Sequence, residues 1–123
     1  MYKLPIEKLK KIQSDIDQAL KDINTEPIAA FDADGTLWAT DMGESLFKYQ
    51  FHNGFIEGLP NDPWNHYKNM HKKDPKTAYL WLAQINAGKS IDDVRKCAKE
   101  CVNTHQELSV FNAQQEIIHY LQN

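Results

Sequence analysis

The chain has 123 residues, so it is at most one domain with a single core. Its hydrophobic share of 41% and charged share of 25% are ordinary for a soluble protein, and a net charge of -3 gives no electrostatic reason to expect a nucleic-acid partner. No apolar run approaches the roughly 18 residues of a membrane span, and the N-terminus lacks the apolar core of a signal peptide. We therefore expect a cytoplasmic protein with no membrane partner.

The first predicted element is an amphipathic helix over residues 5–23. Pro5 suits its first turn, and its apolar residues recur at steps of three and four: Ile6, Leu9, Ile12, Ile16, Leu20 and Ile23. This pattern is typical of a packing helix with no chemistry of its own. The polar residues 24–26 and Pro27 then end it.

A short apolar run follows, which predicts a fully buried strand of a parallel sheet at about 28–32. Asp32 and Asp34 lie at its C-terminal end, followed by Gly35 and Thr36. Because ligands of parallel sheets bind outside the carboxyl ends of the strands, we expect the chemistry here. Two neighbouring acids are costly to bury without a cation, and Mg²⁺ prefers carboxylates together with phosphate oxygens.

The remaining elements are predicted to be helices. Thr40 or Asp41 caps a helix that runs to about residue 52, where Asn53 and Gly54 end it. Asp62-Pro63 and Asp74-Pro75 repeat one start signal, with aspartate as N-cap and proline at the first helical position. The expected helices cover about 63–72, 75–87 (stopped by Gly88), a stretch opened by Ser90, and about 112–122.

The helix opened by Ser90 carries two patterns that resemble metal sites. Asp92 and Asp93 are adjacent acids, but acids in a first helical turn are explained by capping and by the helix dipole. Cys97, Cys101 and His105 share one helical stripe, which suggests a zinc module. Three ligands on successive turns of one helix do not easily surround one ion, so small buried residues are the simpler interpretation.

The order of residues in the predicted strand and its turn, an apolar run followed by Asp32-Ala33-Asp34-Gly35-Thr36, resembles the first signature motif of the haloacid dehalogenase-like hydrolases, mostly phosphatases. The resemblance implies an α/β fold, a Rossmann-like core with a helical cap. The single strand and six helices agree with this fold if the chain is divided in three. Residues 1–42 would hold the first helix and the strand, residues 43–106 the helical cap, and residues 107–123 a helix that leads back to the core. Within this chain itself the fold is then mostly α-helical.

The same resemblance implies a reaction and a cofactor. Asp32 would be the nucleophile that forms an aspartyl-phosphate, and Asp34 would protonate the leaving oxygen and then activate water. Mg²⁺ would be held by Asp32 and by the backbone carbonyl of Asp34, whose side chain stays available. Gly35 would let the backbone approach the phosphate, and Thr36 would tie the turn together.

Further along, Trp38, Gly43, Glu44 and Phe47 resemble the branch that contains phosphoserine and phosphocholine phosphatases, where an acid meets the substrate's amine. A glutamate among aromatic rings suits an ammonium group by charge and by cation–π contact, so the expected substrate is a small phosphate ester, possibly amine-bearing. Two alternatives to this substrate-binding role stay open. Glu44 would be an acid in an exposed first helical turn, and Trp38 and Phe47 would be core residues.

The resembled enzymes also need a strand ending in Ser or Thr, a lysine and a further acidic pair, and none is recognisable after residue 38; Leu108-Ser109-Val110 is too short for the strand. Two interpretations follow: the N-terminal portion of a magnesium-dependent phosphatase, truncated and inactive by itself, or a non-catalytic interaction protein derived from one. A lone strand also leaves its backbone groups unpaired. We therefore expect either a homodimer through strand 28–32, which satisfies a row of groups at once, or helices that close over the segment and shift it out of extended form.

Overall fold

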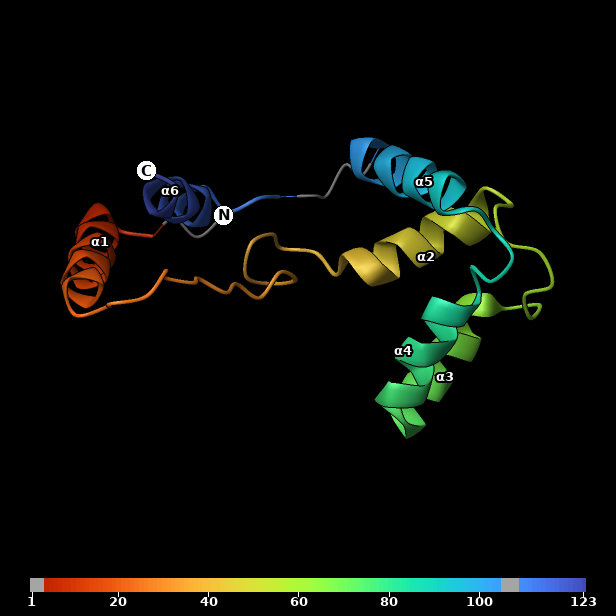
Figure 1. The fold of residues 1–123 in the computed structure, drawn as a ribbon. Coiled ribbons are helices and arrows are strands. Elements are labelled where there is room, and N and C mark those ends of the chain that lie inside the picture. Colours follow the sequence, from red (N-terminus) through yellow and green to blue (C-terminus); the bar gives the residue numbers. More distant parts are fainter. Residues whose placement is uncertain (1–3, 105–108) are drawn as a thin grey trace. The chain divides into compact units, whose positions relative to one another are not determined.

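The computed structural model describes residues 4–104 and 109–123, and helices dominate this part of the chain (Figure 1). They are α1 (Ile6–Lys21), α2 (Met42–His52), α3 (Pro63–Lys73), α4 (Pro75–Gln84), α5 (Ile91–Thr104) and α6 (Asn112–Leu121). The prediction of a mostly helical chain is confirmed. The α/β family fold stays a prediction.

Contacts within the chain divide it into two compact units. Unit 1 comprises Met1–Thr40 and Leu108–Asn123, and unit 2 comprises Asp41–Glu107. The role of unit 2 as the cap of an enzyme stays a prediction.

Unit 1 pairs the first and the last helix of the chain. α1 packs against α6, and the Tyr120 hydroxyl donates to the Asp17 carboxylate at 2.6 Å between them. The apolar stripe of α1 is only partly covered, since Ile6 is 71% exposed. No residue of unit 1 within the described ranges is buried.

The predicted strand at 28–32 is wrong for this chain. Residues 28–32 belong to no strand or helix, and Figure 1 draws them as a plain tube between α1 and the following turn. Ile28 is 92% exposed and Phe31 39% exposed, instead of buried. The physical reason is that a strand forms only by pairing with at least one neighbouring strand, and the described residues supply none for 28–32.

Strand-like pairing occurs a few residues later. Trp38 and Val110 form an isolated antiparallel bridge, flanked by hydrogen bonds from Ala39 N to the Ser109 carbonyl and from Phe111 N to the Leu37 carbonyl, both 2.9 Å. The stretch before α6, which was too short to predict as a strand, therefore contributes one bridge. This bridge joins the turn after residue 32 to the start of α6.

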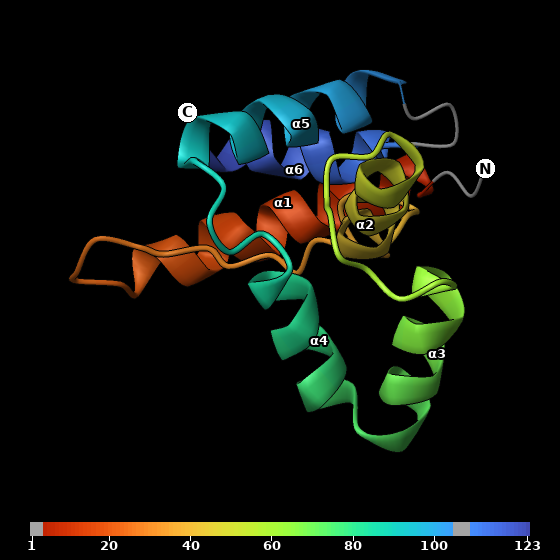
Figure 2. The same cartoon turned by 90° about the vertical axis from the view of Figure 1, so that its right-hand side faces the viewer.

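Unit 2 contains the core. Phe47 of α2, Tyr67 of α3 and Ala78 of α4 are buried together. The Phe47 ring meets Tyr67, Trp81 and Phe51 edge to face. Figure 2 shows α3 and α4 side by side as a hairpin, and α2 contacts α5. Because aromatic side chains cover a large area each, a small unit obtains a dense core from few residues.

The helix starts of unit 2 follow the predicted caps. Carboxylates of Asp41, Asp62 and Asp74 accept from backbone N–H groups of the first turns of α2, α3 and α4. α4 is shorter than the predicted 75–87 because the chain leaves the helix after Gln84 and turns to Gly88, whose φ of 82° suits glycine.

Candidate functional site

The predicted catalytic residues lie in one tight turn of unit 1. The carbonyl of Ala33 accepts from the backbone N–H of Thr36 at 3.1 Å and of Leu37 at 2.7 Å. Gly35 N donates back to the Trp38 carbonyl at 2.7 Å, and Gly35 has a φ of 74°. This left-handed conformation costs glycine little, which explains why glycine is needed after Asp34.

Each carboxylate of the turn is bound by a side chain four residues further on. The Thr36 hydroxyl donates to Asp32 Oδ2 at 2.9 Å, and the Trp38 indole N–H donates to Asp34 Oδ1 at 2.6 Å. The turn thus brings Asp32, Asp34, Thr36 and Trp38 together. The bond between Trp38 and Asp34 was not expected from the sequence, where the Asp34 side chain was left available and Trp38 was assigned to the substrate.

The turn is open to water. Asp32, Asp34 and Gly35 are exposed, while Thr36 and Trp38 are half-buried. Exposed carboxylates carry no large desolvation cost, so the pair does not by itself require a cation. The donor set nevertheless fits Mg²⁺, which accepts one or two carboxylates and keeps most of its waters until phosphate oxygens replace them.

Glu44 lies in a different environment, in the first turn of α2 in unit 2. Its backbone N–H donates to the Asp41 cap at 2.8 Å, and its half-buried carboxylate accepts from the Tyr67 hydroxyl. The pKa of Tyr67 is raised well above its ordinary value, first by burial and then by the Glu44 charge. Glu44 therefore contacts the aromatic core of unit 2, and Phe47, 1% exposed, is a core residue as one alternative expected.

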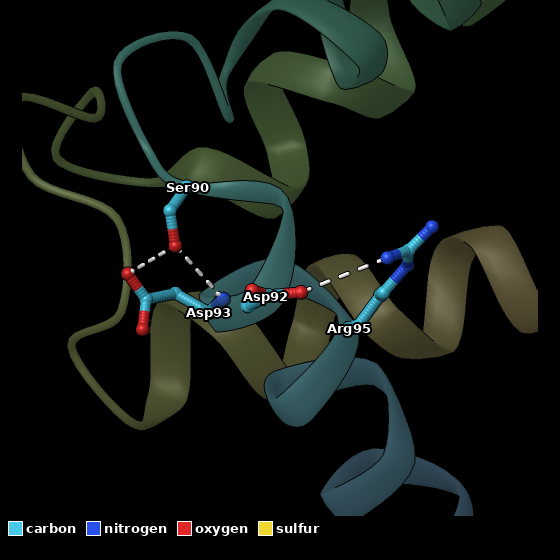
Figure 3. Close-up of polar contacts among 4 residues, drawn as sticks. All are labelled: Ser90, Asp92, Asp93 and Arg95. Atoms are coloured by element: carbon cyan, nitrogen blue, oxygen red, sulfur yellow. Dashed lines mark hydrogen bonds and ion pairs between the residues drawn. The ribbon is translucent and has the colours of Figure 1, made fainter.

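The adjacent acids of α5 act as a helix start. The Ser90 hydroxyl accepts from Asp93 N at 3.1 Å and donates to Asp93 Oδ2 at 2.7 Å, and Asp92 pairs with Arg95 at 3.6 Å (Figure 3). The cap formed by Ser90 with Asp93 is confirmed, and Asp92 is an acid of the first turn that pairs with Arg95.

Cys97 and Cys101 are buried free thiols, and burial raises the pKa of both. His105, the third residue of the suggested zinc module, lies outside the described residues. Over 4–104 and 109–123, no three His, Cys, Asp or Glu residues are grouped closely enough to hold a metal ion. In the same part of the chain, no helix is long and apolar enough to cross a membrane.

The sequence reasoning missed a hollow of about 510 Å³ in unit 2, beside the first turns of α5. Tyr49, Lys89, Lys96 and Glu100 are among its lining residues, and the Tyr49 hydroxyl binds Glu100. The pKa of Tyr49 is raised by burial first and by the Glu100 charge second. Two lysines and two acids line the hollow, so it favours neither anions nor cations. Its lining comes from two separate segments, 49–55 and 89–100, and no local motif could have indicated it.

Comparison with known proteins adds no relative: no family model matches the chain, and neither the curated proteins nor the solved structures contain a match.

Proposed function

We propose that this chain is the nucleophile-bearing portion of a magnesium-dependent phosphatase of the haloacid dehalogenase-like type, which hydrolyses phosphate monoesters through an aspartyl-phosphate. The observation that carries the proposal is the Asp32-x-Asp34-Gly35-Thr36 order combined with its tight turn, where a left-handed glycine leaves both acids at the surface. Such a turn leaves the Asp32 carboxylate where an ester could approach it.

In the first step an Asp32 carboxylate oxygen forms a bond to phosphorus while the bond from phosphorus to the ester oxygen breaks. Asp34 gives its proton to that leaving oxygen. Asp34 then removes a proton from water, the water oxygen attacks the phosphorus, and phosphate leaves with Asp32 restored. Mg²⁺, when bound at Asp32 and the Asp34 carbonyl, neutralises charge on the phosphoryl oxygens.

The hydrogen bonds of the turn support this division of roles. Thr36 binds Oδ2 of Asp32, which fixes the carboxylate so that its other oxygen can be aimed at phosphorus. Trp38 binds Oδ1 of Asp34, which orients the second carboxyl group separately. Each carboxyl group of the turn is thus held by a donor of its own.

The test uses the product of the complete reading frame that contains this chain. With Mg²⁺ and p-nitrophenyl phosphate, Asp32→Asn should lower kcat by roughly a thousandfold or more, because the nucleophile is lost. Asp22→Asn is the matched control, since Asp22 is an exposed acid of the same unit that lies outside the turn, and it should leave kcat unchanged. No phosphatase activity in the complete product would refute the proposal.

For the substrate we propose a small ester that bears an amine or a quaternary ammonium group, as the likeness at Trp38 and Glu44 suggests. The Glu44 carboxylate accepts from Tyr67 beside several aromatic rings, an environment that attracts cations. Glu44→Gln should raise KM about tenfold for esters with an ammonium group and change it little for uncharged esters. An equal change in KM for both ester types would mean that Glu44 has only a structural role at the start of α2.

One observation favours a second candidate, an interaction protein derived from such an enzyme. Both carboxylates already act as acceptors within the turn, a structural role that a remnant motif would keep. In that case Asp32→Asn should lower thermal stability while the complete product shows no activity to lose. If the chain belongs to an active phosphatase, Asp32→Asn should instead lower kcat far more than it lowers stability.

A further inference from the structure

The Trp38 side chain is in direct contact with one of the two acids of the motif. Its indole N–H donates to Oδ1 of Asp34 at 2.6 Å. Trp38 is half-buried, whereas Asp34 is exposed. In the proposed reaction Asp34 gives a proton to the leaving oxygen, so the indole binds the acid of that reaction.

The main chain at Trp38 is held from two directions within unit 1. The Trp38 carbonyl accepts from Gly35 N at 2.7 Å, which closes the turn that carries the motif. Trp38 also forms the antiparallel bridge with Val110, and backbone groups of its two chain neighbours are hydrogen-bonded to residues 109 and 111. A tryptophan side chain has only two torsions, so on this fixed backbone the indole is a donor whose position is set in advance.

We propose that Trp38 is a positioning residue for Asp34, and that Oδ2 of Asp34 carries the proton given to the leaving oxygen; this inference rests on the proposed phosphatase function. An indole N–H only donates, so Oδ1 is the acceptor in this bond. The better acceptor of a protonated carboxyl group is its carbonyl oxygen, so the proton lies on Oδ2. As the bond from phosphorus to the ester oxygen breaks, this proton moves to the ester oxygen and Asp34 becomes a carboxylate.

Such a role determines which esters depend on Trp38. A p-nitrophenolate ion is stable in water and leaves without a proton, whereas an alkoxide has to be protonated as it leaves. A general acid contributes about 10²–10⁴-fold where a proton is needed, so misplacing it is costly for alkyl esters and cheap for p-nitrophenyl esters. The Thr36 hydroxyl differs in this respect, because it binds Asp32, the nucleophile that attacks every ester.

The test measures kcat/KM for propyl, phenyl and p-nitrophenyl phosphate, with Mg²⁺ and the product of the complete reading frame. None of these esters carries an ammonium group, so recognition by Glu44 does not enter. The ratio kcat/KM covers the steps up to release of the alcohol, so hydrolysis of the aspartyl-phosphate does not affect it. Trp38→Phe keeps an aromatic ring and removes the N–H. It should lower kcat/KM about tenfold or more for propyl phosphate, less for phenyl phosphate, and less than about twofold for p-nitrophenyl phosphate.

Thr36→Val is the matched comparison from the same turn. It removes the donor to Asp32 and should lower kcat/KM for all three esters by a similar factor. A second change at position 38 covers the case in which Trp38→Phe lowers stability. A benzothienylalanine there keeps the shape of the indole and has sulfur in place of the N–H, and it should show the same selective loss for propyl phosphate.

The outcomes separate this inference from the proposed function. If both changes at position 38 lower kcat/KM equally for the three esters, or leave it unchanged, the inference is overturned and Trp38 has only a structural role, while the phosphatase function stands. If the complete product hydrolyses none of the esters, the proposed function is refuted, and the role of Trp38 is refuted with it.

Discussion

The two units of this chain use apolar residues in opposite ways. In unit 2, Phe47 is 1% exposed and its ring lies 5.3 Å from the Trp81 ring, whereas in unit 1 Ile6 is 71% exposed and Ile28 92% exposed. Unit 1 carries the acids of the motif, and unit 2 carries the core. The difference shows that an apolar pattern produces a helix locally, but it produces a core only where several elements converge.

The largest expected effect concerns whether the motif of unit 1 can hydrolyse a phosphate ester in the chain of 123 residues. We expect no appreciable hydrolysis of p-nitrophenyl phosphate with Mg²⁺, because the lysine and second acidic pair of the resembled enzymes are not recognisable in the sequence. Removing one such transition-state charge costs about 10²–10³-fold. Strong activity that disappears in Asp32→Asn would contradict this expectation and show that the turn is sufficient.

The next prediction compares how much one apolar side chain of each unit contributes to the stability of the chain. Phe47→Ala should lower the free energy of unfolding by about 3–5 kcal/mol, because it leaves a cavity where three aromatic rings meet. Ile6→Ala, at an exposed position of α1, should change it by less than about 0.5 kcal/mol. Urea unfolding followed by circular dichroism measures both. Similar losses for the two variants would mean that both units depend on one shared core.

A cap comparison gives a smaller effect still. Ser90→Ala should destabilise unit 2 by about 1 kcal/mol, because Ser90 accepts from Asp93 N at the start of α5. Ser14→Ala is the control, since Ser14 is exposed within α1 of unit 1 and alanine has the higher helix propensity. Urea unfolding again measures both variants. If Ser90→Ala is as stable as the unmodified chain, the Ser90 cap does not contribute to stability.

The smallest expected effect is a pH dependence of the α3–α4 hairpin. The backbone N–H of Asn65 lowers the pKa of Asp62 below its ordinary value of 3.8, and the Thr77 hydroxyl lowers that of Asp74. Because these values are lower in the folded chain, the carboxylates stabilise it above about pH 4, and this contribution is lost as pH falls through the folded values. Asp62→Asn should flatten the change in urea midpoint between pH 5 and pH 2. An unchanged slope would mean that Asp62 contributes nothing there.

Local signals predicted most of the helices correctly. Asp62-Pro63 and Asp74-Pro75 mark the starts of α3 and α4, because a cap and a fixed φ act within one turn. The same applies to the turn after Asp34, where the position of Gly35 is set by its own backbone. The bond from Trp38 to Asp34 also spans only four residues, yet no periodicity or motif signals it.

The sequence by itself determined the amphipathic helices, their caps and the order of acids in the motif, since each depends on neighbours within about four residues. Only the tertiary structure decided that 28–32 is exposed, with no strand partner among the described residues, and that Glu44 contacts Tyr67. It also decided that the buried residues of the described ranges all lie in unit 2. The physical reason is that strand pairing and burial depend on residues far apart in the chain. An apolar run such as 28–32 has the composition of a buried strand, but its burial is decided by whatever lies on its two edges.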